Sequence, residues 1–176
     1  MMPKFSYFWI KTPSKTFFIP ARSGSTAICS SVLEKFYPER LNQWKSSGEI
    51  QPHRFMERES IPSNPTAILL RDPVQRFISS CARIKASPQD ALNFNIPINE
   101  YLYFIPVTEI VKDFTNIKYF KFPDQINDFA EYLELPIPVN IENESEIGTK
   151  PVLTNDELSK VQDIFANDID LFNSLY

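Results

Sequence analysis

A short loop of small polar residues, Pro20-Ala-Arg-Ser-Gly-Ser-Thr26, joins an apolar run to a segment with helical spacing. Backbone amides in the first turn of a helix have no partner within the helix, and the helix dipole makes them partly positive. Gly24 would allow an anion to approach the backbone closely, while the hydroxyls and the Arg22 guanidinium would add donors for phosphate or sulfate oxygens. The loop therefore suits an anion cradle, although the same residues also suit an ordinary Ser-rich turn that caps a helix.

A second candidate corner follows the apolar run 66–70. Arg71 stands at the carboxyl end of that run, Asp72-Pro73 turns the chain, and Ser79 lies along the next predicted helix. Ligands of open α/β sheets collect at the carboxyl ends of the strands. An Arg–Asp turn with solvated charges would explain this segment taken alone. Two such corners on neighbouring strands, however, point to one ligand with a phosphate-like group at each end.

Alternating strand and helix patterns would position both corners. Apolar or alternating runs predict strands at 16–19, 66–70 and 117–122, and a predicted helix follows each of them. A capping box at Thr154-x-x-Glu157 begins a last helix, whose apolar stripe is Leu158, Val161, Phe165 and Ile169. This order predicts a single α/β domain over residues 1–176, with a central parallel sheet flanked by helices in three layers.

Composition narrows the classes of ligand and location. The 176 residues carry a formal net charge of −4, which argues against broad binding to nucleic acid, so an anion would need a local cluster of donors. Cys29 and Cys81 lack the paired spacing of a metal site, and we interpret both as small buried residues in a reducing compartment. The N-terminus lacks signal-peptide features, and no run approaches the ~20 apolar residues that span a membrane. We expect a cytoplasmic protein that binds neither nucleic acid nor membrane and needs no metal.

Both corners resemble the nucleotide-binding motifs of sulfotransferases. The loop 20–26 resembles their 5′-phosphosulfate loop, Pro-x-Lys-[Ser/Thr]-Gly-[Ser/Thr]-[Ser/Thr]. Leu70-Arg-Asp-Pro-Val-Gln-Arg-Phe-Ile-Ser79 resembles their 3′-phosphate motif, Arg-Asp-Pro-Val-x-Arg-[Phe/Leu]-x-Ser. The order and the separation of the two motifs match as well. Segments 119–124 and 143–176 are similar to further parts of the family, the latter to carbohydrate sulfotransferases. The resemblance implies a P-loop-like fold.

The resemblance also implies an activity and a cofactor. The family transfers a sulfuryl group from 3′-phosphoadenosine-5′-phosphosulfate (PAPS) to an acceptor hydroxyl, with a glycan as one expected acceptor, and releases 3′,5′-adenosine bisphosphate. On this chain Arg71 and Ser79 would hold the 3′-phosphate, and Lys150, in the remnant 148–150 of a further family motif, is an additional candidate contact. The 5′-phosphosulfate would lie on the amides, hydroxyls and charge of Arg22, Ser23, Gly24, Ser25, Thr26 and Ala27.

By the same resemblance, two residues would carry the chemistry. Arg22 takes the place of the family's Lys, and it would stabilise charge on the leaving oxygen without acting as a general acid, because arginine keeps its proton. His53, the only histidine, lies upstream of the second motif, where many members carry their catalytic His, and would serve as the base. Glu57 and Glu59 compete for that role, since related carbohydrate enzymes use a Glu. A lone His in a polar stretch is also commonly an exposed residue without a special role.

Two other functions stay open. The short chain and Arg22 in place of Lys also suit a non-catalytic relative that binds only the nucleotide or a partner. A small kinase is the other alternative, but the loop lacks the Gly-Lys-[Ser/Thr] ending of a Walker A motif, and no strand ends in an obvious magnesium-binding Asp. Residues 85–115 are the main candidates for acceptor recognition. Their aromatic side chains would either stack on an acceptor or pack into the core: Phe94, Tyr101, Tyr103 and Phe104.

Overall fold

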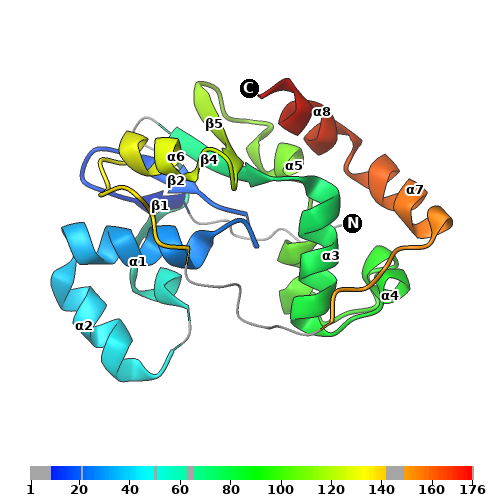
Figure 1. Cartoon of the computed structure of the whole chain (residues 1–176), viewed down its shortest axis with the longest axis horizontal. Coiled ribbons are helices and arrows are strands. Elements are labelled where there is room, and N and C mark those ends of the chain that lie inside the picture. The colour runs from blue at the N-terminus through cyan, green and yellow to red at the C-terminus, as the bar shows by residue number, and fades with distance from the viewer. Residues whose placement is uncertain (1–8, 21, 50, 63–65, 142–148, 176) are drawn as a thin grey trace.

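A mixed sheet lies at the centre of the protein (Figure 1). The computed structural model describes residues 9–20, 22–49, 51–62, 66–141 and 149–175. Within these ranges the sheet has five strands in the order β3-β1-β2-β4-β5. Their bounds are β1 Trp9–Lys11, β2 Thr16–Phe18, β3 Glu57–Glu59, β4 Thr66–Arg71 and β5 Ile117–Phe122. The chain is therefore an α/β protein.

The prediction of a parallel sheet is correct for three strands and wrong for the rest. β2, β4 and β5 run parallel, as predicted, whereas β1 is antiparallel to both of its neighbours, β2 and β3. A tight turn causes the reversal, because the Thr12 amide donates to the Lys15 carbonyl over 2.8 Å and sends the chain straight back. Hairpin connections of this length join only antiparallel strands.

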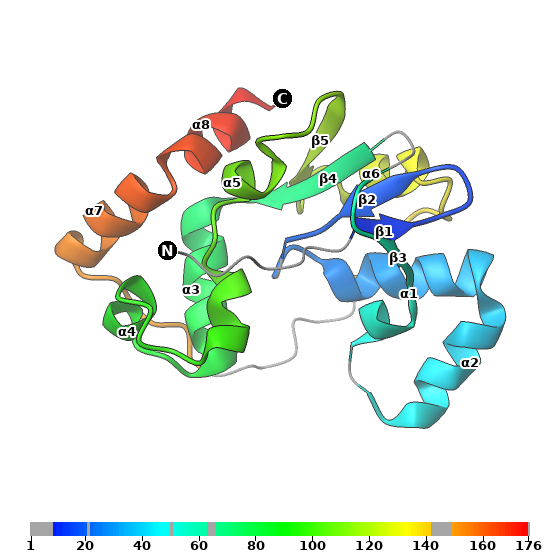
Figure 2. The same cartoon turned by 180° about the vertical axis from the view of Figure 1, so that it is seen from behind.

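Helices cover both faces of the sheet (Figures 1 and 2). Alternate residues of β4 face opposite sides, which is the period of two expected of a strand. Ala67 and Leu69 pack in one buried cluster with α1 (Ser25–Phe36) and α6 (Ile126–Tyr132). Ile68 and Leu70 pack in another with α5 (Val107–Val111) and α8 (Ala166–Ser174). The sheet is thus the middle of three layers.

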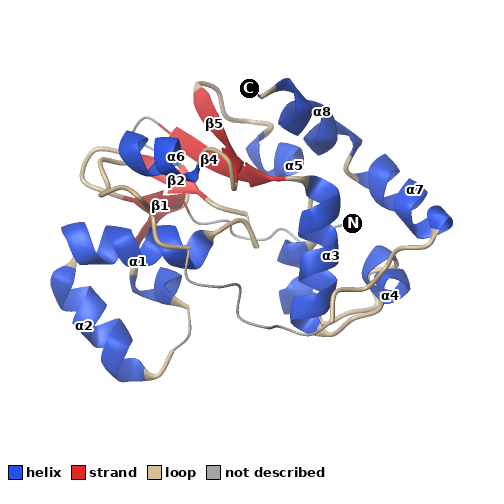
Figure 3. Cartoon of the chain, in the orientation of Figure 1, coloured by secondary structure: helices blue, strands red, loops and turns tan. Residues whose placement is uncertain are grey.

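The remaining helices form two flanking groups (Figure 3). α2 (Pro38–Ser47) and the 3-10 turn η1 (Pro52–Phe55) lie against α1. On the other side, α3 (Pro73–Ile84), α4 (Pro88–Leu92), α7 (Asn155–Ile164) and the 3-10 turn η2 (Ile98–Tyr103) share a separate apolar cluster. Among the described helices, none is long and apolar enough to cross a membrane.

Two sequence features of the helices act as predicted, with one difference each. The capping box begins α7, with the Thr154 hydroxyl accepting from the Glu157 amide over 3.2 Å, but the helix breaks at Phe165 and resumes as α8. Pro38 ends α1 as predicted, and it also occupies the first turn of α2, where a missing amide costs nothing.

Buried side chains match several sequence expectations. Cys29 and Cys81 are buried and form no disulfide, and burial raises the pKa of each thiol to about 12. Phe104 is 2% exposed within the α3–α7 cluster, and Phe94 and Tyr103 pack against the same cluster. The Tyr101 ring lies 5.0 Å from that of Phe94. Packing, the second of the two roles open to these aromatic residues, is therefore the one that the structure supports.

Candidate functional site

The loop after β2 ends at an uncapped helix N-terminus. Arg22 has a φ of 67° and Gly24 a φ of 83°, so two left-handed residues turn the chain from the strand into α1. Gly24 is the N-cap of α1 and offers no side chain to the amides that follow. The first amides of α1, at Ser25, Thr26 and Ala27, therefore face outward without a side-chain acceptor, as an anion cradle requires.

Gly24 cannot be replaced without moving its neighbour. A Cβ placed on Gly24 would lie 2.6 Å from the Phe122 ring, well inside contact distance, and the positive φ disfavours any other residue. Phe122 is the last residue of β5, and its ring lies directly against Gly24 in the loop. No motif in the sequence points to this ring. Its signal lies in the strand register, because β5 pairs parallel with β4 and sets Phe122 opposite Arg71.

The Ser23 hydroxyl is the most unusual polar group of the loop. Ser23 is fully buried, and its Oγ has no hydrogen-bond partner among the described residues. Leaving a buried hydroxyl unpaired costs about 1–3 kcal/mol, so such groups are rare and call for an explanation. Its position beside the first turn of α1 suits an acceptor that arrives with a ligand.

The two corners meet, as the pairing of β2 with β4 requires. The Arg22 Nε donates to the Ser79 Oγ over 3.1 Å, and the Arg71 Nη1 donates to the Arg22 carbonyl over 2.9 Å. The Arg71 guanidinium also lies 5.8 Å from the centre of the Phe122 ring. Residues 49 and 57 positions apart in sequence thus form one connected cluster at the carboxyl edge of the sheet.

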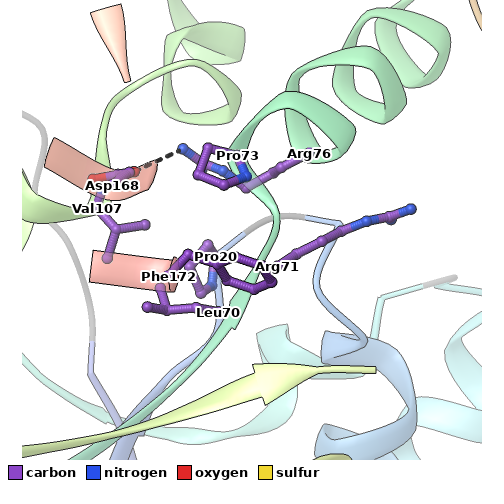
Figure 4. Close-up of a pocket in the computed structure, with 8 residues that line it drawn as sticks. All are labelled: Pro20, Leu70, Arg71, Pro73, Arg76, Val107, Asp168 and Phe172. Carbon is purple, nitrogen blue, oxygen red and sulfur yellow. Dashed lines mark hydrogen bonds and ion pairs between the residues drawn. The ribbon is translucent and has the colours of Figure 1, made fainter. Parts of the chain in front are cut away.

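The chain turns from β4 into α3 between Arg71, which ends the strand, and Ser79, which lies within the helix. Asp72 caps the helix by accepting from the Gln75 amide over 2.8 Å, and Pro73 occupies the first turn. Further along, the Arg76 guanidinium turns toward Asp168 of α8, whereas Arg71 points the other way (Figure 4). The hollow between them, bordered also by Pro20 and Phe172, is too narrow for a water molecule. It is a packed joint rather than a ligand pocket.

Positive charge gathers at this edge although the chain as a whole is acidic. The Arg22 and Arg71 guanidinium groups both lie here, whereas the Lys121 amine lies on the other face of the sheet, 4.7 Å from the centre of the Phe172 ring of α8. Of the described carboxylates in these elements, Asp72 caps α3 and Asp168 faces Arg76. The two guanidinium groups therefore favour an anionic ligand at this edge, although the protein as a whole has a net charge of −4.

The structure does not bring the two candidate glutamates to this cluster. The Tyr37 hydroxyl donates to the Glu57 carboxylate over 3.3 Å, and Tyr37 lies at the far end of α1. A helix of 12 residues is roughly 18 Å long, which separates Glu57 from the loop by that order of distance. Glu59 accepts from the Thr16 hydroxyl over 2.7 Å, at the opposite edge of the sheet. Neither carboxylate has support from this geometry as the base.

His53 lies on η1, which packs against α1 and α2. Burial lowers its pKa below the ordinary 6.5, and the positive charges of Arg58 and Arg54 lower it further. The imidazole is therefore neutral near pH 7, which is the form that accepts a proton. No hydrogen bond in the described part of the chain joins this ring to Arg22, Arg71 or Ser79. Its role as a base stays a prediction.

The last sequence candidate lies beside a part of the chain that is not described. Lys150 is exposed, and the described residues resume at Thr149, so Gly148 of the predicted motif remnant lies outside them. Within the described residues, no hydrogen bond joins Lys150 to Arg71 or to Ser79. Its role at the 3′-phosphate is still a prediction.

Neither a metal site nor a known relative identifies the chemistry of this cluster. Among the described residues, no group of three His, Cys, Asp or Glu side chains lies close enough together to hold a metal ion. Comparison of the chain with models of known protein families, with curated protein sequences and with solved structures gave no match in any of the three.

Proposed function

We propose that this protein is a PAPS-dependent sulfotransferase of P-loop-like fold, acting on an acceptor hydroxyl such as that of a glycan. One observation carries the proposal. The loop that resembles a 5′-phosphosulfate cradle and the corner that resembles a 3′-phosphate site are joined directly through Arg22, Ser79 and Arg71. A nucleotide with phosphate on both the 3′ and the 5′ carbons of one ribose carries one anionic group for each of these two adjoining corners.

The 5′ end would lie on the loop. Among the described residues, no side chain caps the first amides of α1 and the Ser23 hydroxyl has no hydrogen-bond partner, while Gly24 leaves the backbone open to close approach. Dipole and amides together favour an oxygen-rich anion at such a helix N-terminus. The 3′-phosphate would lie on Arg71 and Ser79, where a guanidinium and a hydroxyl already share one neighbour, Arg22.

The reaction would be an in-line transfer. The acceptor oxygen forms a bond to sulfur while the bond from sulfur to the 5′-phosphate oxygen breaks, and the acceptor proton moves to neutral His53 and then to solvent. The products are a sulfate ester and 3′,5′-adenosine bisphosphate. Arg22 and the loop amides would stabilise the charge that develops on the leaving phosphate oxygen, with positioning supplying much of the rate.

A second candidate is a non-catalytic protein that binds the same nucleotide. The observation that favours it is the direction of Arg22, whose Nε donates to Ser79 on the 3′ side of the site rather than toward the loop amides. Catalysis needs that guanidinium at the 5′ end, whereas binding of the nucleotide does not.

Thermal melting distinguishes both of these candidate functions from that of a kinase. At a ligand concentration of 100 times its Kd, a bound nucleotide adds about 2.7 kcal/mol, which for a domain of this size is about 5–11 °C. We expect this shift with 3′,5′-adenosine bisphosphate and not with ATP and magnesium. Stabilisation by ATP alone would overturn the proposal.

A transfer assay then decides between enzyme and binder. Labelled sulfate from PAPS is followed onto a panel of glycans and small alcohols, with the wild type and with Arg71→Gln. Lys118→Gln is the matched control, because it removes a cation from the amino end of β5, whereas Arg71 lies opposite Phe122 at the carboxyl end of that strand. Transfer that is lost in Arg71→Gln and kept in Lys118→Gln supports the enzyme. Binding without transfer to any acceptor supports the non-catalytic candidate.

A further inference from the structure

A buried charge pair lies behind the 3′-phosphate corner. The Arg76 Nη2 is 3.7 Å from the Asp168 Oδ2, and the two side chains are 2% and 5% exposed. In Figure 4 the Arg76 guanidinium and the Asp168 carboxylate face each other, on the side of α3 away from the Arg71 side chain. Neither residue has a role in the nucleotide contacts proposed above, so the pair needs an explanation of its own.

Asp168 ties α8 to the first turn of α5. Its Oδ2 accepts from the Val107 amide over 2.7 Å, and its Oδ1 accepts from the Thr108 amide and hydroxyl over 2.8 and 2.7 Å. Three hydrogen bonds and one cation satisfy most of the acceptor capacity of a buried carboxylate. Asp168 is therefore a rigid anchor rather than a group waiting for a ligand.

Arg76 carries that anchor to α3. Its Nη2 also donates to the Ile105 carbonyl over 2.9 Å, and its guanidinium lies 5.4 Å from the centre of the Phe165 ring. Arg76 precedes Ser79 by three residues on the same helix, and side chains at that spacing share a face. Any rotation of α3 that released Arg76 would also move Ser79, and it would move the helix start beside Arg71.

The free energy of a buried charge pair suggests that Arg76 and Asp168 serve to position α3 rather than to stabilise the fold. Removing two charges from water costs several kcal/mol, and apolar residues of similar size often stabilise a fold as well or better. A charge pair fixes distance and direction in a way that an apolar contact does not. The benefit of Arg76 and Asp168 should therefore appear in where α3 sits.

We propose that Asp168 is a positioning residue, which acts through Arg76 to hold Ser79 and Arg71 at the spacing that a 3′-phosphate needs. The inference rests on the proposed function for its ligand. The C-terminal helix α8 then belongs to the nucleotide site although it contributes no direct contact to the nucleotide.

The test compares two ligands that differ only in the 3′-phosphate. Affinities for 3′,5′-adenosine bisphosphate and for adenosine 5′-phosphate are measured by calorimetry in the wild type and in Arg76→Met, which leaves Asp168 with its three hydrogen bonds. We expect the Kd for the bisphosphate to rise about tenfold and the Kd for the monophosphate to stay unchanged. Asp168→Asn should act in the same way. If that variant does not fold, the double variant with Arg76→Met replaces it, because it leaves no buried charge unpaired.

Val161→Ala is the matched control, since Val161 is fully buried in the α3–α7 cluster and is an apolar residue that belongs to none of the described ion pairs. It should lower the melting temperature and leave the ratio of the two affinities unchanged. A folded Arg76→Met variant with an unchanged ratio would overturn the inference, and so would an equal loss of both ligands.

Hydrogen exchange without ligand separates this inference from the proposed function. Positioning predicts faster amide exchange in peptides that cover 70–80 in Arg76→Met, with no change over α1. If the wild type does not bind the bisphosphate, the proposed function fails, and exchange still decides whether the pair holds α3. Unchanged exchange over 70–80 contradicts the positioning role.

Discussion

Replacement of Gly24 by alanine tests the construction of the loop most sharply. Gly24 has a φ of 83°, and its added Cβ would lie 2.6 Å from one atom and 3.0 Å from another atom of the Phe122 ring. Both the backbone and the ring therefore oppose the substitution. Because Phe122 also neighbours Arg71, a ring that moves away from Gly24 should disturb the second corner as well.

The expected cost is the sum of two contributions. A left-handed conformation costs a residue with a side chain about 1–2 kcal/mol. Overpacking against a ring that cannot move freely costs about 1–3 kcal/mol more. For Gly24→Ala we expect about 3 kcal/mol, or a fall of about 6–12 °C in Tm for a domain of this length.

Gly48 supplies the matched control. It has a φ of 73° and nothing within 4 Å of an added Cβ, so Gly48→Ala should show the backbone cost alone. Thermal and urea unfolding of both variants are compared, and Gly24→Ala is repeated in a Phe122→Ala background. In that background the cost of Gly24→Ala should fall to that of Gly48→Ala.

Three results would refute the reasoning about this loop. The first is an equal loss of stability in Gly24→Ala and Gly48→Ala. The second is a cost of Gly24→Ala that does not change when Phe122 is removed. The third is Gly24→Ala protein that binds 3′,5′-adenosine bisphosphate as tightly as the wild type, because a displaced ring and loop should not keep the cradle intact.

Two further predictions concern the hydroxyl of the loop and the histidine. Ser23→Ala removes a buried hydroxyl that has no described partner, so it should leave the free energy of unfolding unchanged or raise it by about 1 kcal/mol while the bisphosphate binds more weakly. Lower stability with unchanged binding would contradict a ligand role for this hydroxyl. Burial and the charge of Arg58 lower the pKa of His53 below 6.5. The transfer rate should therefore rise with pH below pH 6.5 and stay level above it. The rate of His53→Gln should not show this rise. The folded state binds fewer protons at His53 than the unfolded state does, so its contribution to stability is complete above pH 6.5 and is lost as pH falls. Melting of the wild type between about pH 5 and 7 should therefore depend more steeply on pH than that of His53→Gln.

The sequence predicts the strands that bear the site better than the strands that flank it. The runs at 66–70 and 117–122 are apolar or alternating, and they form β4 and β5 with nearly the predicted bounds. β1 and β3 were not predicted. β3 reads Glu-Arg-Glu and has no apolar period, so only its pairing with β1 makes it a strand.

Within the site, local motifs are visible in the sequence and distant contacts are not. The loop 20–26 and Arg71–Ser79 carry their chemistry in residue types and spacing. Phe122 and Asp168 reach the same region through strand register and helix packing, and no spacing along the chain encodes either contact. For the same reason, the position of Glu57 could not be predicted: it is close to the second motif in sequence, but its carboxylate accepts a hydrogen bond from Tyr37 at the far end of α1.

The central claim is that one nucleotide with phosphates at both ends bridges the loop 20–26 and Arg71–Ser79. The most direct measurement is thermal melting with 3′,5′-adenosine bisphosphate beside melting with ATP and magnesium at equal concentrations. We expect a rise in Tm of about 5–11 °C with the bisphosphate at 100 times its Kd and no comparable rise with ATP. A Tm that the bisphosphate leaves unchanged, or that only ATP raises, would contradict it.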